Sequence, residues 1–314
     1  MKQIALFLAP IRPVLPALVL AMFGFVLLAL PNRRRYRFAA LAAGFTAAAI
    51  AAGSLVTLEP NPRATSHEIA YDAWSRLIVV GVVVLAPLLL LPLVRDVAGH
   101  GSTAAGSVLF GLGGIAIAAA GSAVATTVMG LFAGILGLFG LATTARDELE
   151  EDDVRALRRG LRYALMSLFA AATLATGLGL MIWTGDLGEW SGLAERLAQS
   201  GQTATPLLFA ELLIVAGLLA PAGFPPTHGW SLPAQGGGAA GNSLGLTVIG
   251  GLLAAVGIGR AALGPAALVG GPSPVARPLE ILLWTFAVAG LLYSAYAAAR
   301  SRRIGELLAA IHLA

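Results

Sequence analysis

Charge and cysteine are what this 314-residue sequence has least of. It contains no cysteine, which excludes disulfides, thiolate metal sites and thiol catalysis. Charged residues make up 11% of the chain, where a soluble domain has roughly a quarter, and 58% of the residues are hydrophobic. Lys2 is the single lysine, so arginine carries almost all of the positive charge. This composition predicts an all-α, polytopic protein embedded in the lipid bilayer.

Nine apolar stretches are long enough to cross a bilayer core, which takes roughly 20 residues per helix. The predicted spans are 13–31, 38–58, 73–94, 103–121, 124–144, 160–183, 205–221, 244–264 and 279–299. A tenth apolar piece begins near Ile304. The count depends most on Gly121 and Ser122, which indicate either a turn or the interior of one helix. The sequence therefore predicts a single membrane domain over 1–314 with about nine to ten spans.

Arginines give the orientation, because Lys and Arg concentrate in short cytoplasmic loops. Arginine clusters follow spans one, three, five and nine, which fall on one side if nine spans alternate. The N-terminus is then predicted outside, in a multi-pass protein of the inner membrane. The acids of 147–153 precede the arginines of 155–162, a pattern typical of a solvated helix start. The outside loop 184–205 has apolar spacing that suits a short surface helix.

Glycines in the apolar spans indicate close helix packing. The stretch "GLGGIAIAAAG" follows no predicted strand and has no acidic residue at the distance that a dinucleotide site needs. In a membrane chain such residues more often allow two backbones to approach closely. We therefore predict one small-residue face on the fifth span, formed by Gly130, Gly134, Gly137 and Gly140. No cofactor, metal or nucleic-acid site is expected.

The stretch "PAGFPPTHGW" (221–230) breaks the seventh span. Pro221, Pro225 and Pro226 have no amide proton and clash with the preceding helical turn, so the helix must stop or break there. The following "SLPAQGGGAAGN" is too polar and glycine-rich for a lipid-exposed helix. Irregular backbone at membrane depth is tolerated where it is buried in protein or faces water, and broken helices commonly mark the ion path of a transporter. The break therefore indicates a transport ancestry.

Four segments in order resemble the antiporter-like membrane subunits of respiratory complex I, and most closely the subunit N family of NADH-quinone oxidoreductases. The break resembles that family's K-A-G-x-x-P-F-H-x-W-x-P pattern, with Pro221 at the lysine and His228 at the histidine. "RRGLRYA" (158–164) is similar to E-A-A-L-K-Y-F, with Arg162 at the lysine and Tyr163 at the tyrosine. "RRIGELLAAIH" (302–312) resembles K-R-L-L-A-Y-S-S-I-x-H, and "YDAWSRLIVV" (71–80) resembles D-x-F-x-x-F.

The resemblance implies proton movement coupled to quinone chemistry in a large complex, and this chain departs from it. Such subunits are thought to relay protons through a glutamate on helix five and lysines on helices seven, eight and twelve. Here the helix-five glutamate falls at about Phe132 or Ala133, the helix-seven lysine at Pro221 and the helix-eight lysine at about Ala255. The family also has about four further helices, so the chain resembles its N-terminal two-thirds. A complete pair of half-channels is not expected, unless a second chain supplies the missing helices.

Ionisable residues inside the spans are the remaining candidates for a proton path. We predict His228, Glu211, Arg162 and Arg260 as its lining. Histidine titrates near neutral pH, although His228 could equally hydrogen-bond the broken backbone. Arg260 either snorkels to the interface or pairs with Glu211 on the preceding span. Glu280, Glu306 and His312 complete the set, with Glu280 expected at the interface beside Pro278.

Three functions remain open from the sequence. The first is a membrane-arm subunit of a complex I-like assembly with a scaffold or partial proton-path role, whose partners are other membrane subunits. The second is a component of a cation/proton antiporter or an inorganic-carbon uptake system. The third is an inactive structural or assembly protein. The chain is at most a non-redox subunit of a translocase, since nothing in it resembles a flavin, iron-sulfur or nicotinamide site.

Overall fold

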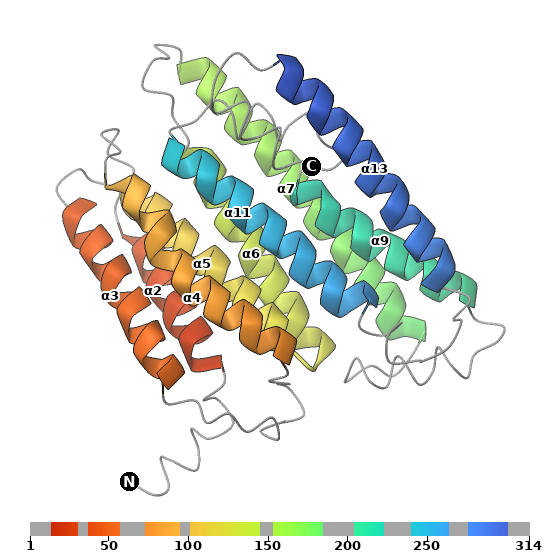
Figure 1. Ribbon diagram of the computed structural model, residues 1–314, viewed down its shortest axis with the longest axis horizontal. Coiled ribbons are helices and arrows are strands. Elements are labelled where there is room, and N and C mark those ends of the chain that lie inside the picture. Colours follow the sequence, from red (N-terminus) through yellow and green to blue (C-terminus); the bar gives the residue numbers. More distant parts are fainter. Residues whose placement is uncertain are drawn as a thin grey trace, which may run out of the picture. The chain divides into compact units, whose positions relative to one another are not determined.

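The computed structural model describes residues 14–30, 37–56, 73–94, 101–144, 153–184, 204–222, 240–263 and 276–300. The described helices are α2 (Leu15–Ala29), α3 (Arg37–Val56), α4 (Ala73–Leu93), α5 (Gly101–Ala120), α6 (Val124–Thr144), α7 (Asp153–Thr184), α9 (Ala204–Ala222), α11 (Ala240–Gly257), the π-helical segment η4 (Ile258–Leu263) and α13 (Ala276–Arg300). Eight of the nine predicted spans each overlap one of these helices, and the span 244–264 runs over α11 and η4 together. The all-α, multi-pass membrane fold is thereby confirmed (Figure 1).

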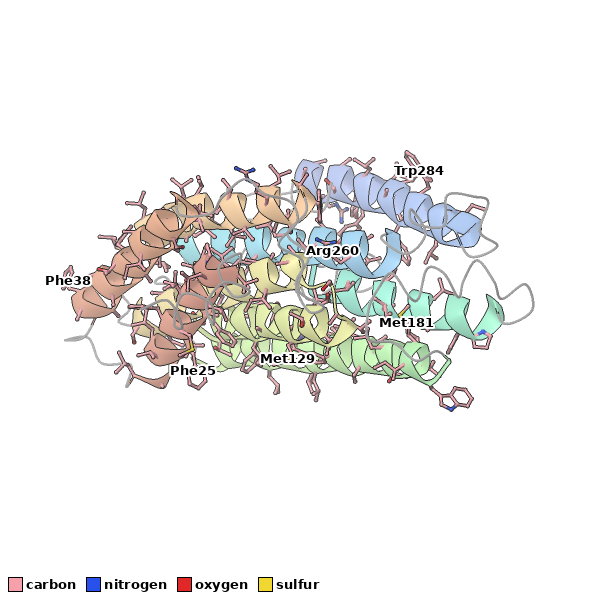
Figure 2. All side chains as sticks on the ribbon, turned by 90° about the horizontal axis from the view of Figure 1, so that it is seen from below. Phe25, Phe38, Met129, Met181, Arg260 and Trp284 are labelled. Atoms are coloured by element: carbon pink, nitrogen blue, oxygen red, sulfur yellow. The ribbon has the colours of Figure 1, made fainter. Side chains whose placement is uncertain are left out.

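Five described helices are long and apolar enough to cross a membrane, over the ranges Phe38–Leu55, Ala73–Leu93, Ser102–Ala120, Val124–Thr144 and Leu161–Trp183. Leu15–Ala29 and Leu244–Arg260 are shorter apolar helices. Many large side chains on these helices stand outward, as Figure 2 shows for Phe38 on α3 and Trp284 on α13. Such exposed apolar faces are expected where a helix meets lipid or a neighbouring subunit.

The chain divides into two compact units, Met1–Thr144 and Ala145–Ala314. In the first unit α5 lies at the centre, in contact with α2, α3, α4 and α6. Its membrane-spanning window is 83% buried, whereas the other four candidate spans are 33% to 50% buried. In the second unit α9 takes the central place, in contact with α7, α11, η4 and α13. The prediction of one membrane domain over 1–314 stays a prediction.

A tight turn joins α5 to α6. Gly121 donates its amide to the Ala118 carbonyl, and α6 begins at Val124. The buried Thr127 hydroxyl lies 3.2 Å from the carbonyl oxygens of both Gly121 and Ala123. Gly121 and Ser122 therefore form the turn between two spans, and the count that separates 103–121 from 124–144 is correct.

The predicted small-residue face of α6 is present. Gly130, Gly134, Gly137 and Gly140 are all buried. A Cβ added to Gly137 would lie 2.5 Å from the Gly111 Cα of α5 and 2.8 Å from the Ser107 carbonyl oxygen. Only glycine allows the two backbones to approach this closely, so the face holds α6 against α5.

Candidate functional site

The predicted site residues fall into three groups. Arg162 on α7 and Arg260 on η4 have described side chains. Glu211 lies within α9, and Pro221 is the second-last residue of that helix. Pro225, Pro226 and His228, like His312, lie outside the described residues, so their roles stay predictions.

Close packing of α7 against α9 organises the second unit. A Cβ on Gly177 of α7 would lie 2.7 Å from the Ala210 carbonyl oxygen and 2.9 Å from the Ile214 amide nitrogen of α9. A Cβ on Gly217 would in turn lie 2.8 Å from the Leu174 amide nitrogen and 2.9 Å from the Ala170 carbonyl oxygen. Residue numbers rise along α7 as they fall along α9, so the two helices are antiparallel. One glycine on each helix thus sets the distance between them.

The motif that contains Arg162 and Tyr163 divides between two faces of α7. Tyr163 is buried, together with Ser167 one turn later, and both lie on the stripe that continues through Ala170 and Leu174 to α9. Arg162 is exposed on this chain, because a shift of one residue turns a helical side chain by about 100°. We predicted Arg162 as the path residue of this motif, and the structure buries its neighbour Tyr163.

The eighth span ends in a π-helix that carries Arg260. The segment η4 continues directly from α11 and packs against α9, where Ile258 contacts the buried pair Val215 and Leu219. A Cβ on Gly257 would meet the Leu218 side chain. Arg260 is half-buried and has an interaction partner. π-Helical turns occur frequently at functional sites, since the extra residue redirects the side chains around it.

Glu211 and Arg260 belong to adjacent elements. Glu211 precedes Val215 by four residues, about one turn, along α9. Arg260 follows Ile258 by two residues, and α11 runs antiparallel to α9 (Figure 1). Both sequence positions thus lie on the same side of the contact between Val215 and Ile258. The ion pair between them stays a prediction.

The positions that match the family's relay residues hold no ionisable group. Ala133 on α6 packs against α5, where a Cβ added to Gly114 would lie 2.6 Å from the Ala133 Cβ. Ala255 on α11 is exposed on this chain, and Pro221 closes the end of α9. Among the described residues no three His, Cys, Asp or Glu side chains are placed to hold a metal ion.

Several buried polar residues were not singled out from the sequence. Ser167, Asn242 and Ser294 in the second unit are buried inside otherwise apolar helices. Ser107 and Thr127 are buried in the first unit. The one sequence signal for Ser167 was its spacing of four residues from Tyr163, which puts both hydroxyls on one helical face.

Two curated proteins are similar in sequence to part of this chain. NADH-quinone oxidoreductase subunit N of Granulibacter bethesdensis is 30% identical over 123 residues, which cover 39% of this chain and 25% of that protein. The subunit N of Rhodospirillum rubrum is 30% identical over 103 residues, which cover 33% of this chain and 20% of that protein. The similar region thus spans a quarter or less of the curated relatives. No protein-family model matches the chain.

Solved structures share the fold over nearly the whole chain. A chain of the membrane-bound sulfane sulfur reductase, an archaeal respiratory membrane complex, aligns with 98% of this chain and 62% of its own length, at a TM-score of 0.70 and 12% identity. A chain of respiratory complex I from Thermus thermophilus with bound NADH aligns with 96% of this chain and 62% of its own length, at a TM-score of 0.70 and 17% identity. A chain of the Mrp complex from Dietzia aligns with 98% of this chain and 56% of its own length, at a TM-score of 0.62 and 16% identity.

These similarities agree with the sequence motifs and with the helix order of the structure. The resemblance to antiporter-like membrane subunits is therefore confirmed: the chain is similar in sequence to NADH-quinone oxidoreductase subunit N, and it has the fold of the membrane subunits found in complex I and Mrp assemblies.

Proposed function

We propose that this chain is a membrane-arm subunit of a complex I-like proton-translocating NADH-quinone oxidoreductase assembly. The observation that carries the proposal is the 30% identity to subunit N over 123 residues, and the fold shared with a complex I chain over 96% of this sequence supports it. The structural neighbours are chains of multi-subunit membrane complexes, which supports other membrane subunits as partners.

Within such an assembly the role is scaffold or partial proton path. A glutamate at the Ala133 position would meet α5, because a Cβ on Gly114 already lies 2.6 Å from the Ala133 Cβ. The α5–α6 contact is built from glycine, alanine and serine, and it offers no titratable side chain to accept a proton there. This contact therefore favours a scaffold role, in which the chain holds neighbouring subunits together, over proton transfer through the α5–α6 contact.

If protons pass through the chain, His228, Glu211, Arg162 and Arg260 line their path. Three of these positions belong to helices of the second unit: Arg162 to α7, Glu211 to α9 and Arg260 to η4. Both α7 and η4 pack against α9. Arg162 and Arg260 would contribute guanidinium hydrogen-bond donors that hold a carboxylate or a water beside the path.

A second function is favoured by the likeness to the Mrp complex, at a TM-score of 0.62. In that case the chain is a component of a cation/proton antiporter or of an inorganic-carbon uptake system. An inactive structural or assembly protein would have the same fold. For each function we propose that the chain lies in the inner membrane with its N-terminus outside, as the arginine-rich loops predict.

The decisive experiment is to tag the protein in its native cell, extract it in mild detergent and identify by mass spectrometry what migrates with it on a native gel. We expect co-migration with quinone-reductase or hydrogenase subunits. Co-migration with an antiporter set or a soluble hydratase-like protein would favour the second function. Migration at monomer size would contradict the respiratory assignment.

A further inference from the structure

The last described helix, α13, has two sides of different character. On its inward side Leu282 and Phe286 pack on the buried pair Val215 and Leu219 of α9. The large side chains of its outward side are each more than half exposed, and they are Ile281, Trp284, Val288, Leu291, Leu292 and Tyr296. We call this set the outward face of α13. It is an apolar surface that no described part of the chain covers.

The outward face of α13 has the length and composition of a surface in contact with lipid. From Ile281 to Arg300 the helix rises about 28 Å, close to the roughly 30 Å of a bilayer's hydrocarbon core. The closest helix contacts of this chain are instead made by small residues, such as Gly137 against α5. Trp284, which stands outward in Figure 2, and Tyr296 lie toward the two ends of the face, and aromatic residues are enriched at both membrane interfaces. Lipid is therefore the occupant that matches the face.

Positive charge lies at the C-terminal end of the outward face. The guanidinium carbon of Arg300 lies 5.0 Å from the centroid of the Tyr296 ring, an arrangement in which the ring attracts the cation. Arg300 is exposed and is the last residue of α13. The sequence continues with Arg302 and Arg303, so that residues 300–306 hold three arginines and one glutamate, Glu306. Arginines directly after a spanning helix attract anionic lipid headgroups.

We propose that the C-terminal end of α13 binds an anionic phospholipid, whose phosphate contacts Arg300 beside Tyr296 and whose acyl chains lie along the outward face of α13. A guanidinium donates two parallel hydrogen bonds to a phosphate, and the Tyr296 ring holds it at the interface. Leu292 and Val288 lie about 12 Å and 18 Å from Arg300 along the helix axis, within the depth that the chains of one leaflet reach. Charge and apolar surface thus occur in the order in which a phospholipid presents its headgroup and its tails.

The binding site does not depend on the proposed respiratory function. It requires only that α13 crosses the membrane, as the multi-pass fold implies. Loss of the site would leave the assignment of the chain to a complex unchanged, and migration of the chain at monomer size would leave the site unchanged.

The first test measures lipid binding to the full chain, extracted in mild detergent with its co-purifying subunits, by native mass spectrometry. The probes are phosphatidylglycerol, which is anionic, and phosphatidylcholine with the same acyl chains, which has no net charge. Arg300→Gln should weaken phosphatidylglycerol binding about five-fold, the effect of one basic residue beside an anionic lipid, and should leave phosphatidylcholine binding unchanged. Arg76→Gln is the matched control, because Arg76 is also exposed but belongs to α4. Equal losses in the two variants, or no loss in Arg300→Gln, would overturn the proposal.

A competition experiment separates a lipid headgroup from a free anion. Inorganic phosphate at millimolar concentration should not displace phosphatidylglycerol, because the acyl chains contribute most of the contact with the outward face of α13. Displacement by phosphate alone would show that Arg300 holds a free anion, and the proposed lipid site would then be wrong.

The second test shows whether lipid or protein covers the outward face of α13. The chain has no cysteine, so Val288→Cys creates a single attachment point for a nitroxide spin label. In vesicles that contain phosphatidylglycerol, the label should be mobile and should collide more often with oxygen, which concentrates in lipid, than with a water-soluble nickel complex. An immobile label that neither reagent reaches would show that another protein segment covers the face. That result, or equal access for both reagents, would contradict the proposal.

Discussion

The helices of the two units pack through different kinds of residues. The first unit surrounds α5 with helices that meet it through glycine and alanine, and its described spans bury hydroxyls but no ionisable side chain. The second unit also uses glycine between α7 and α9, yet it carries a buried tyrosine and a π-helix with an arginine. Tight packing and polar irregularity are thus separated along the sequence. Capacity for proton chemistry is therefore expected in the second unit.

Introducing an acid in each unit would give the largest difference in stability between the two units. Ala133→Glu places a carboxylate against α5 where the backbones are in contact, and we expect a loss of about 3–5 kcal/mol, enough to prevent stable expression. Ala255→Glu is the matched control, because Ala255 is exposed on this chain. The measurement is the yield and thermal midpoint of detergent-extracted protein. Equal yields of the two variants would show that the α5–α6 contact can open to accept a charge.

Adding a methyl group at the α5–α6 contact should have the next largest effect on stability. Gly137→Ala would place its Cβ 2.5 Å from the Gly111 Cα, so the helices must separate, and we expect a cost of about 3 kcal/mol in thermal or denaturant unfolding. Gly53→Ala and Gly81→Ala are the controls, since nothing lies within 4 Å of a Cβ at either position. A Gly137→Ala midpoint equal to that of the controls would mean that α5 and α6 are not closely packed in the membrane.

Substitution of Arg260 tests whether its charge is paired with that of Glu211 in the second unit. If Arg260 pairs with Glu211, Arg260→Gln leaves a carboxylate without its partner, and we expect a cost of about 2–3 kcal/mol. Glu211→Gln in addition should recover most of that loss, because both charges are then gone. Thermal midpoints of the two single variants and the double variant give the coupling energy. Additive costs would exclude the pair.

The smallest expected effect concerns the contact between α7 and α9. Gly177→Ala should cost about 1–2 kcal/mol, less than Gly137→Ala, because one of the neighbouring atoms is the Ile214 side chain, which can move. Gly179→Ala, two residues later on the open side of α7, should be neutral or stabilising. The comparison uses the same thermal unfolding assay. A destabilised Gly179→Ala variant would indicate that a further subunit packs on that side.

Hydropathy predicts the spans of this chain well because burial in lipid leaves so few alternatives. The limits of the fifth span, 124–144, match α6, and the predicted end of the seventh span lies within one residue of Ala222. Hydropathy does not report helix extensions into water, so α7 begins at Asp153 and not near residue 160. Asp153 and the arginines of 155–162 lie in the first turns of that helix, whereas the acids of 147–152 lie outside the described residues.

The candidate site is less accessible to sequence reasoning. A π-helix differs from an α-helix by one residue, which hydropathy cannot detect, so the segment Ile258–Leu263 around Arg260 was not predicted. Attention to charge favoured Arg162, whereas the buried face contains Tyr163, since apolar periodicity decides which side of α7 turns inward. Interhelical contacts such as that of Gly217 with Ala170 depend on helix register, which one sequence does not determine.

The short turn between α5 and α6 bears on how the protein is made. Only three residues separate the end of α5 at Ala120 from the start of α6 at Val124, so the two spans form contacts of low sequence separation, for which the entropy lost on closing the loop is small. Contacts of this kind form fastest during folding. We therefore expect the α5–α6 hairpin to form as a unit during synthesis, and α2, α3 and α4 to settle on α5 afterwards.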